Sequence, residues 1–422
     1  MMMTSRERVR AAINHRTPDR APIDLGATPV SGIAASTYAK LRAAFGLPAE
    51  RVKVHEPFQV LGLVEGEMLD LLGVDTLPIH PPATMFGFRN ERWKPWQLFD
   101  GTEVLVPGDF NLTTDDRGDL YIYPCGDMSV PPSGHMPNGG FYFDAIVRQQ
   151  PIDEKDLRPE EWIDGQVGRY SDDDLAFLQG QADRLYAETE RSLVFWFGGG
   201  GLGDIAVVPG PMVKHPKGIR APEDWYAAHM EYPEYIKGIY ALQTEIALEN
   251  LTLLHQALGE KIDVIGISGT DFGMQSGPFI NPASYREFFL PHHTRINAWV
   301  HEHTHWKTMF HSCGSNIAFL DDFVAAGVDI LNPVQCSAAG MDPETLKAHW
   351  GDKLVFWGGA VDTQRVLPFG TPEEVRAQTT ERLRILGKGG GLVAGAIHNI
   401  QMQTPVENVL AFFETMKETA AA

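Results

Sequence analysis

The chain has 422 residues, of which 43% are hydrophobic and 21% are charged, so it can bury a large core and is not a disordered protein. Its net charge of −20 is spread along the sequence without a stripe of lysine and arginine, which excludes nucleic acid as a partner. Three scattered cysteines and the lack of an apolar stretch of about 20 residues indicate a cytoplasmic protein without a disulfide framework or a membrane span.

Short apolar runs alternate with longer amphipathic segments along most of the chain. This alternation is typical of repeated βα units, which build a parallel sheet. The runs that we expect to form strands are Ala21 to Gly26, Thr76 to His80, Leu193 to Gly199, Asp263 to Thr270, Lys307 to His311, Asp329 to Pro333, Leu354 to Gly359 and Gly391 to His398. A closed parallel barrel needs eight strands, so these runs predict a single (β/α)8 barrel over residues 1–422.

Several helices have recognisable starts. Thr371-Pro372 and Thr404-Pro405 each place a threonine before a proline and precede a glutamate, which predicts a capping box at the helix start. Asn281-Pro282 and Asp342-Pro343 repeat the pattern of a cap followed by proline. Tyr232-Pro233 predicts a break in a long helical segment, because proline is not tolerated inside a helix.

Residues 87–164 depart from the βα pattern. Glycine, proline, aspartate and aromatic residues dominate there, and alternating runs such as Leu120 to Tyr123 predict hairpins. We therefore expect an irregular β-rich insertion between the second and third barrel strands. Long insertions are often functional, so it is predicted to form part of a lid or an oligomer contact, with passive surface decoration as the alternative.

The strongest chemical signal lies at the ends of two predicted strands. His311 and Cys313 are two residues apart where one strand ends, and residues at this spacing in extended chain project to the same face. His398 ends the last predicted strand, and barrel enzymes gather such ends at one mouth. A His/Cys/His site with an open fourth position would suit catalytic Zn²⁺. On spacing alone, the simpler interpretation is a buried apolar Cys313 and histidines that cap loops.

Other polar side chains follow predicted strands. Asp271, Gln275, Asn332 and Gln335 are the candidates for positioning a substrate or supporting metal ligands, although each could instead form a turn or a helix cap. Cys336 is an alternative third ligand if His398 points away.

The sequence resembles the uroporphyrinogen decarboxylase superfamily over nearly its whole length. Within it, the chain looks more like the zinc-dependent corrinoid methyltransferases than like the true decarboxylases. The segments that carry the resemblance are Arg6 to Gly26, His311 to Gly314, Asp329 to Pro333, Gly340 to Pro343, Phe356 to Gly359 and Thr404 to Asn408.

The resemblance implies a zinc ion held by His311 and Cys313, with a third ligand that is cysteine in the methyltransferases. This chain has His398 at that place, which is an equally good zinc ligand. It implies methyl transfer between a small methylated molecule, or a thiol, and a corrinoid protein. No corrinoid-binding Asp-x-His-x-x-Gly motif is recognised here, so the corrinoid (cobalamin) is expected on a separate partner. A homodimer is a further expectation.

Two rival functions stay open. The first is metal-free decarboxylation of a porphyrinogen or another carboxylate. True uroporphyrinogen decarboxylases resemble one another in an amino-terminal segment whose arginines bind substrate carboxylates, whereas this chain has Asp24 to Val30 there. The second is a non-catalytic protein that binds a corrinoid or tetrapyrrole, because a binding protein could display the same polar strand ends.

Overall fold

The alternating apolar and amphipathic segments fold into a parallel sheet covered by helices. The computed structural model describes residues 3–48 and 51–419, so both ends of the predicted range 1–422 lie outside the described residues. The central sheet has seven parallel strands, in the order β15 (Leu392–Val393), β14 (Val355–Trp357), β13 (Ile330–Asn332), β12 (Lys307–His311), β11 (Val264–Ser268), β10 (Ser192–Trp196) and β3 (Thr76–Ile79). The curled sheet is an α/β fold of the half-barrel kind, and its strands coincide with seven of the predicted runs.

The first predicted strand, Ala21 to Gly26, is not a regular strand. Its only ladder contact among the described residues is a parallel bridge from Ile23 to Ala394. The Asp24 amide also donates to the Ala394 carbonyl at 2.8 Å, and the Asp75 amide donates to the Ile23 carbonyl at 2.8 Å. This short segment therefore links the two edges of the sheet without forming a ladder of its own.

The last predicted strand is shorter than Gly391 to His398. The chain leaves the regular ladder after Val393, because Ala394 pairs with Ile23 and Ala396 then pairs with Val361 in single bridges. His398 consequently lies in a loop beyond β15 rather than at the end of a strand.

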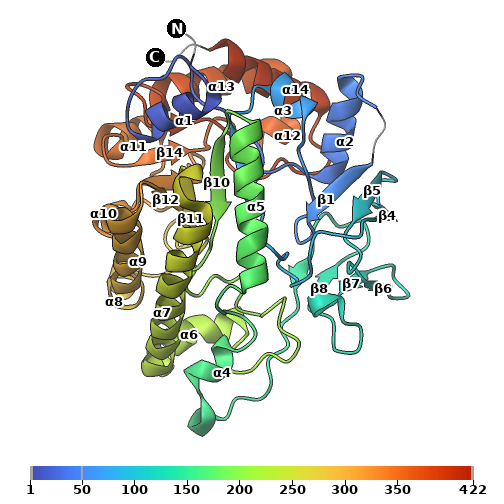
Figure 1. Cartoon of the computed structure of the whole chain (residues 1–422), viewed down its shortest axis with the longest axis vertical. Helices are drawn as coiled ribbons and strands as arrows, with labels where there is room; N and C mark the ends of the chain where they lie inside the picture. Colours follow the sequence, from blue (N-terminus) through green and yellow to red (C-terminus); the bar gives the residue numbers. More distant parts are fainter. Residues whose placement is uncertain (1–2, 49–50, 420–422) are drawn as a thin grey trace.

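Helices surround the sheet (Figure 1). Their bounds are α1 (Ser5–Ile13), α2 (Ala35–Ala44), α3 (Glu67–Leu72), α4 (Pro159–Ile163), α5 (Asp172–Glu188), α6 (Pro222–Glu231), α7 (Pro233–Leu258), α8 (Pro282–Phe288), α9 (Leu290–His303), α10 (Leu320–Ala325), α11 (Pro343–Trp350), α12 (Val366–Phe369), α13 (Pro372–Leu386) and α14 (Val406–Glu418), with short 3-10 turns at Pro124–Gly126, Glu154–Asp156 and Gly259–Lys261. No helix in these residues is long and apolar enough to cross a membrane.

Most of the predicted helix starts are confirmed. Thr371 forms a capping box with Glu374 at α13, and the break at Tyr232-Pro233 separates α6 from α7. Asn281 and Asp342 cap α8 and α11 with their side chains. The capping box at Thr404 is wrong, because the Thr404 hydroxyl donates to the Gln401 carbonyl and the helix begins at Val406.

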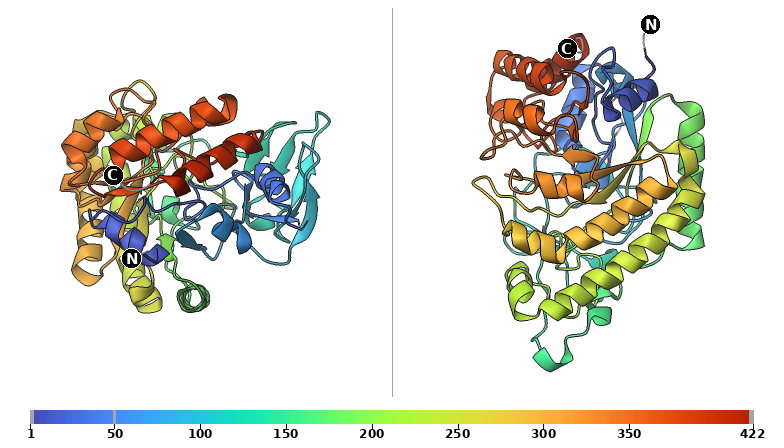
Figure 2. Two further views of the ribbon diagram at one scale, coloured as in Figure 1. Left: turned by 90° about the horizontal axis from the view of Figure 1, so that it is seen from above. Right: turned by 90° about the vertical axis from the view of Figure 1, so that its left-hand side faces the viewer.

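The β-rich region forms two small sheets beside the central one (Figure 2). The first has the order β2 (Leu61–Gly62), β1 (Val52–Glu56), β5 (Glu103–Val106) and β4 (Lys94–Gln97), and the second the order β6 (Leu112–Thr114), β7 (Leu120–Ile122), β8 (Gly134–Met136) and β9 (Asp144–Ala145). The predicted hairpin strand at Leu120 is β7. The β-rich region starts earlier than expected, because β1 and β2 precede residue 87.

Apolar side chains fill the inside of the curled sheet. A cluster separate from the main core joins inward residues of the strands to the first helix; its members are Val9, Ala12, Ile13, Ala27, Val194, Val264, Met309, Ile330, Val355, Trp357 and Val393. The amphipathic α1 therefore covers one end of the sheet interior. The opposite end, where the strands finish, is left for polar side chains.

Candidate metal centre and substrate cavity

Three side chains from two distant parts of the sequence meet at the carboxyl ends of the strands. His311, Cys313 and His398 each present a ligand atom, and these atoms lie within 4.8 Å of one another. The Nε2 atom of His311 is 3.3 Å from the Cys313 sulfur, and the rings of His311 and His398 have centroids 5.5 Å apart. The structure thus brings together the three residues that the sequence analysis selected.

The orientation of His311 is fixed by its neighbour on the next strand. His311 ends β12, Asn332 ends β13, and the two residues pair in register. The Asn332 amide nitrogen donates to the Trp357 carbonyl at 3.1 Å, so its oxygen faces the Nδ1 atom of His311 at 2.6 Å. Nδ1 therefore carries the proton, and Nε2 presents a free lone pair toward Cys313 and His398.

Two side-chain oxygens, one from a carboxylate and one from an amide, accept hydrogen bonds from the backbone of the loop that carries Cys313. The Cys313 amide donates to Oδ1 of Asp271 at 2.6 Å, and the Gly314 amide donates to Oε1 of Gln335 at 2.6 Å. Gly314 has φ +81°, and a Cβ there would lie 2.5 Å from the Gly273 backbone, so only glycine allows this close turn. Asp271 and Gln335 thus position the thiol.

Burial governs the electrostatics of the three groups. It lowers the pKa of His311 and of His398 to about 4, which keeps both imidazoles neutral at pH 7. Burial and the nearby Asp271 carboxylate raise the pKa of the Cys313 thiol well above its usual range. Neutral imidazoles are good ligands, whereas a thiolate in this place needs a nearby cation to stabilise its charge.

The three groups lie on the wall of a cavity of about 510 Å³. Most of the wall is apolar; it includes Pro29, Val30, Phe58, Met85, Trp196, Phe197, Ile205, Val207 and Met212. No lysine or arginine of the described residues lines this cavity. A cavity of this size and polarity suits a small organic molecule with few charged groups.

A second, more open cavity of about 400 Å³ reaches the same cluster from another side. It shares Cys313 and His398 with the central cavity, and its rim is polar, with Gln275, Gln335, Asp362, Gln364, Asn399 and Gln401. Gln275 is exposed and donates to Gln364 at 3.3 Å. Of the four candidates for substrate positioning, Asp271 faces the central cavity, Gln275 and Gln335 face the second one, and Asn332 lines neither.

Sequence reasoning missed two polar groups near the cluster and one elsewhere on the wall of the central cavity. Asp204 lines the central cavity, and burial together with Asp271 raises its pKa to about 7. The hydroxyl of Tyr226 is buried and has no hydrogen-bond partner among the described residues. His80 lines the central cavity and directly follows β3; its position as the last residue of a predicted strand was an available signal.

Cys336 lies outside the cluster. It packs against the hydrophobic core, and Arg382 and Asp342 are the charged groups that act on its thiol. Neither cavity at the cluster includes it. The placement therefore favours His398 over Cys336 as the third ligand.

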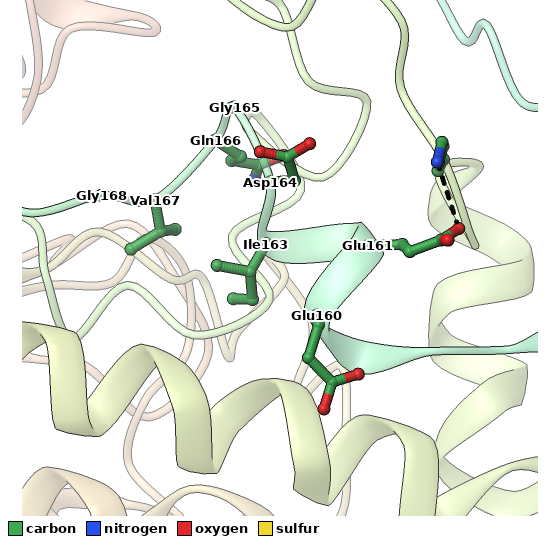
Figure 3. Close-up of a pocket in the computed structure, with 9 residues that line it drawn as sticks. Glu160, Glu161, Ile163, Asp164, Gly165, Gln166, Val167 and Gly168 are labelled. Atoms are coloured by element: carbon green, nitrogen blue, oxygen red, sulfur yellow. Dashed lines mark ion pairs between the residues drawn. The ribbon is translucent and has the colours of Figure 1, made fainter.

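Another hollow, of about 740 Å³, lies at α4 and shares no residue with the central cavity (Figure 3). Lys217 pairs with Glu161 there at 3.4 Å, while Glu160 points in a different direction from Glu161. The side chains do not converge on one point, so this hollow does not make a second candidate site.

Comparisons with known proteins agree with the resemblance. Residues 217–419 match the family described as Uroporphyrinogen decarboxylase (URO-D), a range that contains all of the resembling segments after residue 300 but not Arg6 to Gly26. A uroporphyrinogen decarboxylase of Psychromonas ingrahamii is 27% identical over 34% of this chain and 39% of that protein. One of Nostoc punctiforme is 24% identical over 67% of this chain and 74% of that protein.

The second class of relative is a methyltransferase. A methylated-thiol–coenzyme M methyltransferase of Methanosarcina mazei is 28% identical over 34% of this chain and 35% of that protein. A solved methyltransferase from Methanosarcina mazei superposes with a TM-score of 0.56 and 15% identity over 99% of both chains, which shows a shared fold. The predicted resemblance to this superfamily is confirmed for residues 217–419, and decarboxylases and a methyltransferase are both among the relatives.

Proposed function

Because the chain carries a uroporphyrinogen decarboxylase family domain over residues 217–419, we propose that it is a metal-dependent methyltransferase of this superfamily. It would move a methyl group between a small methylated molecule, or a thiol, and a corrinoid protein. The observation that carries the proposal is the His311–Cys313–His398 cluster, whose ligand atoms lie within 4.8 Å of one another on a cavity wall. The proposed fold is a (β/α)8 barrel in which residues 22–24 take the place of the eighth strand.

The donor set fits zinc. Ligand atoms of tetrahedral Zn²⁺ lie roughly 3.3–3.8 Å apart, given bonds of about 2.0–2.3 Å. The 3.3 Å between His311 and Cys313 is inside this range, and the 4.8 Å limit on the other pairs requires only a small adjustment. Bound zinc would supply Lewis acidity to the heteroatom that gains or loses the methyl group.

The residues of this chain would organise the transfer. Asn332 holds His311 in the tautomer that a metal needs, and Asp271 and Gln335 hold the Cys313 loop through its amides. Both cavities open onto Cys313 and His398, so a methylated substrate and a corrinoid could approach the cluster from different sides. A methyl transfer by displacement requires donor and acceptor on opposite sides of the carbon.

The insertion at residues 87–164 would act as a lid. Its Asn90 lines the central cavity and donates to the His55 carbonyl at 2.8 Å, and the Phe143 amide donates to the Phe58 carbonyl at 2.7 Å. These contacts with cavity-lining residues support a role as a lid. Excluding water there would strengthen the electrostatic interactions of the site.

Decarboxylation of a porphyrinogen is the alternative that the relatives raise. Its substrate carries many carboxylates, which need cationic partners. The central cavity has no lysine or arginine among its described lining residues, and Asp204 and Asp271 would repel such a substrate. The charge of the cavity therefore favours methyl transfer. The same reasoning disfavours a carrier for carboxylate-rich tetrapyrroles.

The proposal is tested by turnover of zinc-loaded protein. One assay supplies methylcobalamin with coenzyme M or 2-mercaptoethanol, and the other supplies cob(I)alamin with methoxylated, methylated-amine and methylthio compounds; uroporphyrinogen III serves as the decarboxylase substrate. We expect methyl transfer in one direction, and its loss in Cys313→Ala. Decarboxylation of the porphyrinogen that persists in Cys313→Ala would reject the proposal.

A further inference from the structure

A pair of histidines lies on the central cavity wall away from the metal cluster. His55 is on β1 and His80 directly follows β3, and their rings meet edge to face with centroids 5.0 Å apart. Neither imidazole makes a hydrogen bond with the described residues. Both residues are half-buried and line the cavity, so the pair offers polar ring nitrogens that a ligand in the cavity can bind.

The order of the cavities places this pair opposite the cluster. A third cavity, of about 330 Å³, shares His55, His80, Pro81 and Asn90 with the central cavity. The cavity with the polar rim shares Cys313 and His398 with the central one, and it has no lining residue in common with the third. The three cavities therefore form a series, with the metal cluster at one junction and the histidine pair at the other.

The far side of the pair carries both cations and carboxylates, so the hydrogen-bond donors of the pair itself select the ligand. Arg89 and Arg184 line the third cavity together with Glu91, but Arg89 pairs with Asp174 at 2.9 Å and Arg184 pairs with Glu188 at 3.1 Å. The nearest acidic side chain in sequence, Glu56, has its two oxygens occupied by the amides of Phe58 and Gln59 at 2.9 and 2.8 Å. Burial lowers the pKa of His80 to about 4, so each ring is a neutral N–H donor at pH 7.

We propose that His55 and His80 bind a carboxylate at the end of the substrate remote from its methyl group. The substrate is then an elongated methylated carboxylate with an apolar body, not methanol or methylamine, which would leave most of the 510 Å³ cavity unfilled. This inference deepens the proposed function and rests on it for the identity of the reacting end.

The test compares two probes by calorimetry on the full-length, zinc-loaded protein: 4-methoxybenzoate and methoxybenzene, which lacks the carboxylate. We expect the first to bind about 10-fold to 100-fold more tightly. In His55→Phe and His80→Phe this preference falls below about 3-fold, while the affinity for methoxybenzene stays unchanged; His80→Gln, which keeps an N–H donor, retains part of the preference. His303→Phe, at an exposed histidine that bonds only Trp299, is the matched control and leaves both affinities unchanged.

Equal binding of the two probes, binding of neither, or a preference that survives in both phenylalanine variants would overturn the inference. Failure of the proposed function looks different. A carboxylate preference that depends on the histidines, in a protein without methyl transfer, rejects the function but keeps the binding site. Methyl transfer without the preference rejects the binding site but keeps the function.

Discussion

The buried carboxylates at the two ends of the central sheet differ in whether they have cationic partners. At the amino-terminal end, Asp75 accepts hydrogen bonds from Arg8 and Arg20 at 2.7 Å each, and Asp263 accepts from Arg10 at 2.6 Å. At the carboxyl-terminal end, Asp204 and Asp271 have no lysine or arginine partner in the described part of the chain. At the amino-terminal end each of these carboxylates is paired with arginine, whereas at the carboxyl-terminal end they have no cationic partner among the residues that the structure describes. From this comparison we infer that the first end stabilises the fold, and the second is where we propose that a ligand binds.

The largest loss of stability is expected from a substitution at the amino-terminal end, where the carboxylates are paired with arginine. Asp75→Asn leaves Arg8 and Arg20 without their shared buried carboxylate, and breaking such a buried pair costs about 3–5 kcal/mol. Urea unfolding monitored by circular dichroism measures the loss. The matched variant, Asp271→Asn at the other end, removes no cation pair and is expected to cost much less. An equal loss in both variants would contradict the comparison.

The next effect is a pH dependence at the cavity. Burial raises the pKa of Glu56 from 4.5 to about 7, so the folded protein holds this proton more tightly than the unfolded chain does. The free energy of unfolding should therefore fall as the pH rises from about 4.5 to about 7, by on the order of 2–3 kcal/mol. In Glu56→Gln this fall of the free energy of unfolding with pH should disappear. Unfolding curves at a series of pH values test it, and an unchanged slope in the variant would refute it.

A smaller effect is expected at the support of the metal ligands. Asn332→Ala removes the hydrogen-bond acceptor that fixes the tautomer and the ring orientation of His311. We expect zinc binding to weaken about 10-fold to 100-fold, while the protein still folds. Competition with a chromophoric chelator measures the affinity. Gln275→Ala removes an exposed amide that bonds only Gln364, so its zinc affinity should change less than about 2-fold. Similar losses in the two variants would mean that Asn332 has no specific role.

Strand periodicity predicted the fold well because buried parallel strands are apolar on both faces. The prediction failed at residues 21–26 and 394–398, which pair only through single bridges. An apolar pattern shows that a run is buried, but it does not show whether the run forms a regular hydrogen-bonded ladder. The approach of His311, Cys313 and His398 to one another was predictable because the carboxyl ends of parallel strands meet at one side of the sheet. His55 was not, because it lies on a strand of the accessory sheet, and only folding brings it against His80.

The central claim, that His311, Cys313 and His398 bind a metal ion, is tested most directly by metal content. Protein purified without added metal is compared with His311→Ala, Cys313→Ala and His398→Ala by mass spectrometry of the bound metal. We expect near-stoichiometric zinc in the wild type, its loss in all three variants, and its retention in Cys336→Ala, whose thiol lies outside the cluster. Zinc that persists in the three variants, or a wild type that binds none even after remetallation, would contradict the account.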